Sequence, residues 1–289
     1  MPSKFDALKA LENKKSKLAD ALVADFGADL RRALKQLNSR VSLLIGRLKV
    51  DDNDRLVSDQ INLTRAINAR QEIINVFERA GYSDSVKNLI GGYDDLSVLV
   101  KQGLALGGAA VSFTQVDISA IQALKQLDFQ RWSRFGDEII GIGHEQLVGS
   151  VIGTANVGTL SDAIAGLLTG EGTADSLIDS RADTIANTLT QAFDRTLTMR
   201  KSEEAGIDTF IYLGPDDQVT RPFCKAVLDG KGSSDFNIPK SDGGLYTRDQ
   251  IDDMDNGVAG LPVMEFGGGY NCRHKFAPLS KRVAKEVGI

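Results

Sequence analysis

Apolar residues in the first fifty positions recur at steps of three and four. The positions are Leu18, Leu22, Phe26, Leu30, Leu34, Leu37, Val41, Leu44 and Leu48. This spacing predicts a helix of roughly nine turns with one apolar stripe and charged side chains on its other faces. The acidic run at residues 51–54 interrupts the pattern and is placed to cap a following helix.

A second apolar stripe follows the acidic run. It consists of Leu63, Ile67, Ile74 and Phe77, is interrupted by Arg70, and ends near Gly81. Two long helices joined by a short polar turn form a helical hairpin, which we assign to residues 1–90. The hairpin is either part of a self-contained bundle or an arm that contacts another subunit. We favour the arm, because an isolated two-helix hairpin needs a further packing surface.

Residues 91–205 are predicted to form a second helical region. Small residues dominate 103–110, which permits close backbone approach and indicates a flexible connection. One helix is expected over 118–135 and another over 177–200. Between them, a helix is expected to begin with Thr159 as its cap and to end within 169–173. His144 is interpreted as a loop or helix-start residue.

The pattern changes after Gly206. Residues 209–213 are β-branched and aromatic and predict a short strand, and Thr247 is placed to cap a short helix. Many glycines separate these segments. We therefore predict an α+β fold, with a mainly α-helical N-terminal two-thirds of long helices and a small glycine-rich α+β module at 206–289.

Composition excludes several classes of protein. A hydrophobic content of 42% and a charged content of 25% are normal for a soluble globular chain. The net charge of -5 argues against a dedicated nucleic-acid binder, and an aromatic content of 6% against a base-stacking platform. No apolar run of membrane length and no signal peptide are evident. Two cysteines do not make a secreted disulfide scaffold, so we expect folding in a reducing cytosol.

The candidate chemistry lies in two short segments that hold both cysteines and one of the two histidines. Cys224, Cys272 and His274 are zinc-type ligands, and Asp217 is a candidate for the fourth position. The alternatives are a disulfide between the cysteines and plain packing with hydrogen bonds. We favour packing and expect no cofactor, with zinc as the alternative.

The same residues admit other functions. Cys224 with His274 is a candidate for nucleophilic catalysis, which also needs an oxyanion site. Asp217 and Thr220 are expected to form an Asx-type turn. Arg221 and Arg273 are expected to pair with acidic neighbours, or else with nucleic-acid phosphate. The glycines at 267–269 can cradle an anion, but they lack the Lys-Ser/Thr of a phosphate loop.

Five segments, taken in order, resemble the phage Mu F-like head morphogenesis family, which comprises minor head proteins of tailed phages and prophages. The resemblance covers about residues 150–280. The segments are Arg181–Thr188, Glu204–Ile207, Asp217-x-x-Thr220-x-Pro222-x-Cys224, Leu228–Lys231 and Asn271-Cys272-Arg273-His274. The structural signature is therefore assigned to Asp217, Thr220, Cys224, Asn271, Cys272, Arg273 and His274.

This chain departs from the family pattern at three positions. Arg221 stands at the first cysteine position, Gly269 at the histidine, and His274 at the last cysteine. Three ligand residues of a larger set remain. The departure favours a hydrogen-bonded loop junction over a bound metal.

The resemblance implies a virion component in the capsid interior or at the portal vertex, present in the host cytoplasm during assembly. Its implied partners are the portal protein and other head proteins, with self-association and packaged DNA as further contacts and no membrane. Its implied role is to assist head assembly and DNA packaging or delivery, without enzymatic turnover. The alternative is a cysteine- or metal-dependent hydrolase that uses Cys224 and His274, and a third hypothesis is a DNA-contacting module.

Overall fold

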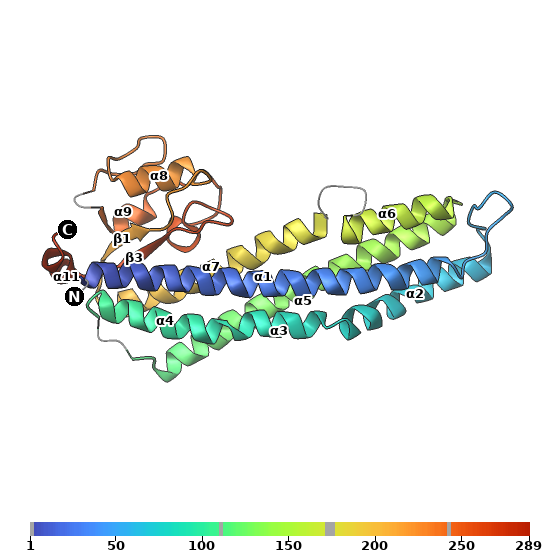
Figure 1. The fold of residues 1–289 in the computed structure, drawn as a ribbon, viewed down its shortest axis with the longest axis horizontal. Helices are drawn as coiled ribbons and strands as arrows, with labels where there is room; N and C mark the ends of the chain where they lie inside the picture. Colours follow the sequence, from blue (N-terminus) through green and yellow to red (C-terminus); the bar gives the residue numbers. More distant parts are fainter. Residues whose placement is uncertain (1–2, 110–111, 171–176, 242–243) are drawn as a thin grey trace. The chain divides into compact units, whose positions relative to one another are not determined.

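The computed structural model describes residues 3–109, 112–170, 177–241 and 244–289, and it has the predicted fold class. Long helices form the N-terminal part and a small antiparallel sheet with short helices the C-terminal part (Figure 1). The first group is α1 (Lys4–Ile45), α2 (Gln60–Arg79), α3 (Tyr82–Gly91), α4 (Tyr93–Leu106), α5 (Gln115–Ile152), α6 (Val157–Thr169) and α7 (Leu177–Glu204). The second is β1 (Thr209–Leu213), α8 (Pro222–Asp229), β2 (Leu245–Thr247), α9 (Arg248–Asp252), α10 (Val263–Phe266), β3 (Lys275–Pro278) and α11 (Lys281–Glu286). Among the described helices, none combines the length and apolarity needed to cross a membrane.

Contacts group the chain into two compact units. The first unit joins the residues up to Val23 with 91–125 and 184–289, and the second joins 24–90 with 126–183. Helices α1, α5 and α7 each contribute residues to both units. The grouping does not follow the sequence ranges 1–90, 91–205 and 206–289, so those ranges stay a prediction.

The core of the second unit is built around aromatic rings. Trp132 of α5 is fully buried, with the Phe26 ring of α1 at 4.5 Å and the Phe135 ring at 5.6 Å. The Tyr82 hydroxyl donates a hydrogen bond of 2.6 Å to the Trp132 carbonyl oxygen. Gly136 makes room for that contact, because a Cβ there would lie 2.6 Å from the Tyr82 ring.

Three local expectations about the helices were wrong. Asp59, rather than the run at 51–54, caps α2 through a 2.7 Å bond from the Asn62 amide. Asn156, rather than Thr159, caps α6, since its carboxamide oxygen accepts from the amides of residues 158 and 159. His144 lies inside α5, which continues through Gly149 to Ile152. Capping preferences predicted a helix start near the correct position in the sequence, but they did not identify the capping residue.

The small-residue stretch before residue 110 is mostly helix. Residues 93–106 form α4, so 103–106 are helix and not a connection, while 107–109 lead from α4 towards α5 and residues 110–111 lie outside the described residues. Close backbone approach does occur at the end of this helix. A Cβ on Gly107 would lie 2.2 Å from the Pro278 carbonyl oxygen of β3, and Ser280 donates its amide to the Gly107 carbonyl at 2.9 Å. Only glycine permits that approach.

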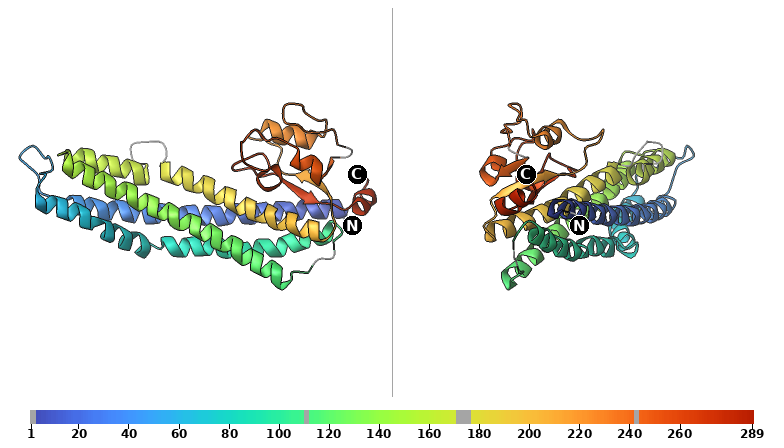
Figure 2. Two further views of the ribbon diagram at one scale, coloured as in Figure 1. Left: turned by 180° about the vertical axis from the view of Figure 1, so that it is seen from behind. Right: turned by 60° about the vertical axis from the view of Figure 1, so that its left-hand side comes forward.

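The sheet of the first unit has the order β2-β1-β3, antiparallel throughout. Phe210 pairs with Tyr246 on one side and with Pro278 on the other. Alternation along β1 sends Phe210 and Tyr212 to one face and Ile211 to the other. Helices α8 and α9 lie over the first face in each view (Figure 1; Figure 2). The second face packs against Leu8 of α1 and Val283 of α11.

Buried charges connect three elements of the first unit. Lys275 of β3 lies 2.7 Å from Asp194 of α7 and 3.1 Å from Glu12 of α1. Lys15 of α1 lies 2.9 Å from the same Asp194 carboxylate. Each of these four side chains is at most 5% exposed. The two cations and two anions balance, which is the condition for burying them without a large desolvation cost.

Candidate functional site

The two sequence signatures meet at one buried cluster in the first unit. Cys224 lies in the first turn of α8, whose N1 position is Pro222, and Cys272 and His274 lie just before β3. The Cys224 and Cys272 sulfur atoms are 3.7 Å apart. One donor atom from each cysteine and from His274 lies within 4.8 Å of the others. The three residues are 1%, 5% and 3% exposed, so bulk water does not surround them.

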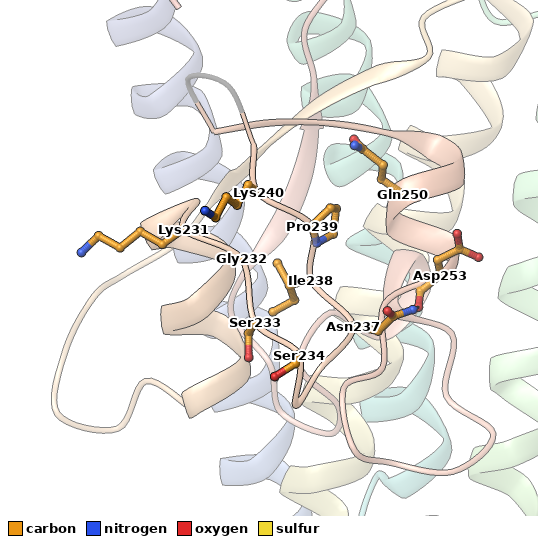
Figure 3. Close-up of a pocket in the computed structure, with 10 residues that line it drawn as sticks. All are labelled: Lys231, Gly232, Ser233, Ser234, Asn237, Ile238, Pro239, Lys240, Gln250 and Asp253. Atoms are coloured by element: carbon orange, nitrogen blue, oxygen red, sulfur yellow. The ribbon is translucent and has the colours of Figure 1, made fainter.

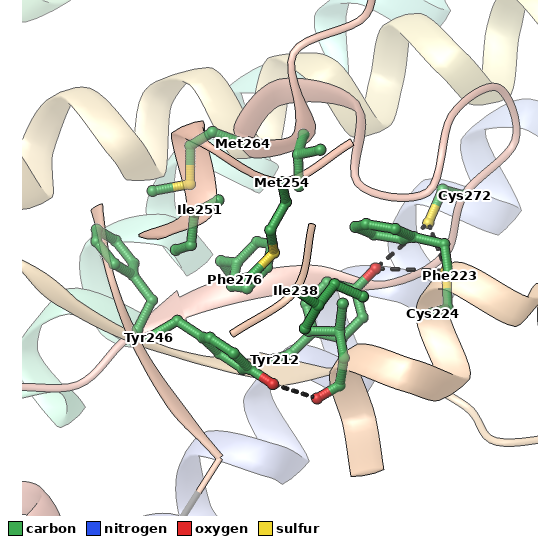
Figure 4. Close-up of a cluster of buried hydrophobic side chains, with 13 residues drawn as sticks. Tyr212, Phe223, Cys224, Ile238, Tyr246, Ile251, Met254, Met264, Cys272 and Phe276 are labelled. Carbon is green, nitrogen blue, oxygen red and sulfur yellow. Dashed lines mark hydrogen bonds between the residues drawn. The ribbon is translucent and has the colours of Figure 1, made fainter. Parts of the chain in front are cut away.

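Each sulfur atom accepts a hydrogen bond from a nearby donor. The Gly268 amide donates to Cys272 Sγ at 3.1 Å, and the Tyr212 hydroxyl donates to Cys224 Sγ at 3.4 Å. Figure 4 shows this hydroxyl facing both sulfur atoms. Glycine is required at position 268, because a Cβ there would lie 2.5 Å from Cys224 Sγ. The loop at 267–269 therefore directs an amide at sulfur in this structure.

The two thiols differ in acidity because a hydrogen bond links their sulfur atoms. The hydrogen bond with Cys224, helped by His274, Arg195 and the Gly268 amide, lowers the pKa of Cys272 against the opposing effect of burial. The same hydrogen bond, together with burial, raises the pKa of Cys224. The hydrogen bond between the sulfur atoms thus makes Cys272 the more acidic of the two thiols.

His274 is fixed by packing. Its ring stacks on Tyr212 with centroids 5.4 Å apart. Gly214 provides the space on another side, since a Cβ there would lie 2.3 Å from the His274 ring. The Nε2 atom is buried and has no hydrogen-bond partner among the described residues. The cluster therefore contains an imidazole nitrogen that makes no hydrogen bond to the described residues.

Two arginines hold the loops that carry the cluster. Arg195 of α7 donates to the carbonyl oxygens of Cys272 and His274, the latter at 2.8 Å, and to that of Glu265 at 3.1 Å. Arg221 donates to the carbonyl oxygens of Gly268, at 2.6 Å, and of Tyr270. Their guanidinium groups fix the backbone on both sides of Cys272.

The remaining signature residues form a polar rim. The Asp217 carboxylate accepts from Thr220 Oγ1 at 3.0 Å and from the Val219 amide at 3.2 Å, which confirms the predicted turn. Arg273 pairs with Asp217 at 2.7 Å, as expected of an acidic neighbour. Arg221, in contrast, binds backbone carbonyls instead of a carboxylate. Asp217 is thus engaged by the rim, and the candidate fourth ligand is not among the clustered donors.

Asn271 links the last signature to α7. Its backbone sits in the left-handed region at φ 57°, its amide donates to Thr188 Oγ1 and its carboxamide to Thr184 Oγ1, both at 3.4 Å. Asparagine tolerates this conformation better than most residues. The first and last segments of the resemblance therefore touch each other.

A pocket of about 240 Å³ opens beside the cluster. It is lined by both cysteines and His274 together with Val219, Thr220, Arg221, Asn271 and Arg273. A cavity of this size holds several waters or a small anion. The donor atoms are therefore buried but adjacent to a space that solvent can enter.

A second pocket, of about 470 Å³, lies in the loop after α8 (Figure 3). Its lining includes Lys231 and Lys240 along with Gln250 and Asp253. It shares no residue with the pocket at the cysteines. Its lining holds neither a histidine nor a cysteine, so the ligand chemistry of the module is concentrated at the first pocket.

Sequence reasoning missed the residues that support the cluster. Arg195 and Tyr212 belong to no motif, and their roles depend on contacts with residues more than ten positions away. The one available signal was Arg195 itself, a charged residue between the buried Phe193 and Leu197 of α7. A buried arginine on a helix needs acceptors from another element.

The disulfide alternative is not realised in the structure, where both cysteines are free. Comparisons of the chain with protein-family models, with curated proteins and with solved structures found no match.

Proposed function

We propose that this chain is a minor head protein of a tailed bacteriophage, bound near the portal and assisting head assembly and DNA packaging or delivery. The proposal starts from the ordered resemblance of residues 150–280 to the phage Mu F-like family. It concerns a structural and interaction protein without turnover.

The observation that carries the proposal is the convergence of the separate signature segments. Asn271 hydrogen-bonds to Thr184 and Thr188 from the helical segment of the resemblance, and Arg273 pairs with Asp217 from the middle one. Residues that only pack would not require specific polar partners more than fifty positions away. The convergence supports reading the segments as one signature.

Exposed apolar side chains on the second unit support a role in protein contacts. Leu43 of α1, Ile67 of α2 and Ile152 of α5 are 59%, 58% and 62% exposed. Burying such side chains against a partner contributes favourable free energy. This is the behaviour expected of helices that dock on a portal or on sibling subunits.

Mass spectrometry of purified particles tests the proposal directly. The chain should be present at a fixed low number of copies per particle, and it should co-purify with the portal protein. A matched pair of variants, Ile67→Asp on the exposed face and Asn88→Asp on an exposed polar site, separates docking from general charge effects, because each adds one negative charge. Particles that contain no copy of the chain would contradict the proposal.

The hydrolase remains the second candidate because of one observation. Both cysteine sulfur atoms lie beside the His274 imidazole and line a pocket of about 240 Å³. Alkylation of the native protein with iodoacetamide tests it, since a nucleophile that acts on substrates must react while the fold is intact. Particles that carry Cys272→Ala and remain fully infective would argue against this candidate.

The structure weakens the hypothesis of a DNA-contacting module at this site. The guanidinium groups of Arg221 and Arg273 are committed to Gly268, Tyr270 and Asp217. A phosphate contact at these two side chains would have to use the N–H groups that those bonds leave over.

A further inference from the structure

The cysteine pair has the spacing of two ligands on one tetrahedral metal ion. With zinc–sulfur bonds of about 2.3 Å at the tetrahedral angle, two sulfur ligands lie about 3.8 Å apart. The two sulfur atoms here are 3.7 Å apart. A disulfide needs about 2.05 Å, so this spacing matches shared coordination more closely than a covalent bond.

The third donor is His274. A ring nitrogen lies within 4.8 Å of both sulfur atoms, and the buried Nε2 lacks a hydrogen-bond partner among the described residues. Leaving such a nitrogen unpaired costs free energy, and metal coordination removes that cost. Two sulfur donors and one imidazole are the ligand types that zinc takes in proteins.

We propose that Cys224, Cys272 and His274 bind one zinc-class cation, with a fourth coordination position open to the adjacent pocket. The lining of that pocket offers no further cysteine, histidine or carboxylate. Asp217 is held in the rim by Arg273 and Thr220. The fourth ligand is therefore water.

The surrounding hydrogen bonds suit a metal-bound cluster. The Gly268 amide and the Tyr212 hydroxyl both point at ligand sulfur atoms, as supporting groups around metal sites do. Coordination takes two thiolates and a neutral imidazole, so the thiol protons of Cys224 and Cys272 pass to solvent on binding. The two thiolates then balance the charge of the divalent ion. Arg195 keeps its carbonyl acceptors in this state.

Cobalt binding to the full chain tests the site. Protein purified under reducing conditions and stripped with a chelator is titrated with Co²⁺ under anaerobic conditions, followed by displacement with Zn²⁺. One equivalent should bind with a thiolate-to-cobalt charge-transfer band and the intense visible bands of tetrahedral cobalt. Elemental analysis should find one zinc per chain after displacement. This measurement does not depend on particles or portal, so it stands apart from the proposed function.

Variants assign the ligands. Cys224→Ser, Cys272→Ser and His274→Gln should each weaken binding more than about 100-fold, and Tyr212→Phe, which keeps the ring, by about 10-fold. His144→Gln is the matched control, because the other histidine lies inside α5 and contacts the Ile67 carbonyl oxygen. Circular dichroism reports whether each variant is folded.

Two outcomes would overturn the proposal. One is a folded wild-type chain that takes up no cobalt or zinc at micromolar concentration under reducing conditions. The other is uptake that survives replacement of either cysteine or of His274. If a variant does not fold, protection of the two wild-type thiols from a disulfide reagent decides in its place. Stoichiometric zinc should protect both thiols, and no protection counts against the site.

Discussion

Arg195 shows how one side chain can set the geometry of a site without taking part in it. Its guanidinium group satisfies carbonyl oxygens on both sides of the loop that carries Cys272, and it is only 5% exposed. The cysteines and His274 were identifiable from their chemistry in the sequence. Arg195 was not, because its acceptors are backbone atoms and leave no trace in residue type.

Replacing Arg195 by Met should destabilise the chain by about 3 to 5 kcal/mol, because buried carbonyl oxygens lose their donors. The measurement is urea unfolding at neutral pH. Arg282→Met is the matched control, since Arg282 is 74% exposed and its pair with Glu286 is long, at 3.9 Å. Equal stability of the two variants would show that the carbonyl contacts contribute nothing.

At the scale of elements, prediction succeeded where local sequence decides the conformation. The strand at 209–213 and the Thr247 capping box are determined by nearby residues, and the structure has both. It failed for α4, since the small residues that indicated flexibility are there for packing. Position 107 must be glycine because a Cβ atom there would collide with the carbonyl oxygen of Pro278, a residue far away in the sequence. Such a reason is visible only in three dimensions.

Two glycine-to-alanine changes separate these effects. Gly107→Ala should cost about 2 kcal/mol, because the new Cβ collides with the Pro278 carbonyl oxygen. Gly141→Ala, inside α5 with no atom within 4 Å of the new Cβ, should instead stabilise by about 0.5 to 1 kcal/mol. Both are measured by thermal unfolding. Gly107→Ala at or above wild-type stability would contradict the close approach.

The junction of α5 with α7 should depend on pH. Burial opposes the charge of Asp117, but hydrogen bonds from Lys201 and Thr114 outweigh it and lower its pKa to about 2. Because the folded pKa lies below the unfolded value, the carboxylate stabilises the fold above about pH 4 and loses that effect as pH falls towards 2. The contribution at neutral pH is about 2 kcal/mol.

Unfolding of wild type and Asp117→Asn between pH 2 and 6 measures this contribution. The stability gap between the two proteins should be full above pH 5 and should close towards pH 2. Carboxylates that do not contact this group, including Asp194, titrate equally in both proteins and cancel in the gap. Glu204 pairs with the same Lys201 and is therefore replaced by Gln in both proteins. A gap that stays constant over the range would rule out the proposed coupling.

At the scale of the molecule, the first unit is assembled from both ends of the chain. Leu8 of α1 packs against Ile211 and Leu279, and Glu12 and Lys15 complete the buried charges around Asp194. A module predicted from the sequence at 206–289 lacks these residues. Periodicity identified α1 as a helix but carried no information about which strand it would cover.

The C-terminal sheet should therefore depend on the first 23 residues. A chain that begins at residue 24 leaves Asp194 and Lys275 without Glu12 and Lys15, and it exposes the face of the sheet that Leu8 covers. Hydrogen exchange followed by mass spectrometry should show loss of protection in peptides covering β1 and β3. Peptides around Trp132 in the second unit serve as the internal control and should keep their protection. Because the buried charges and the apolar face are removed together, partial protection of β1 and β3 would still indicate dependence. Unchanged exchange at both strands would mean that the module folds without α1, and the sequence range 206–289 would then be the folding unit.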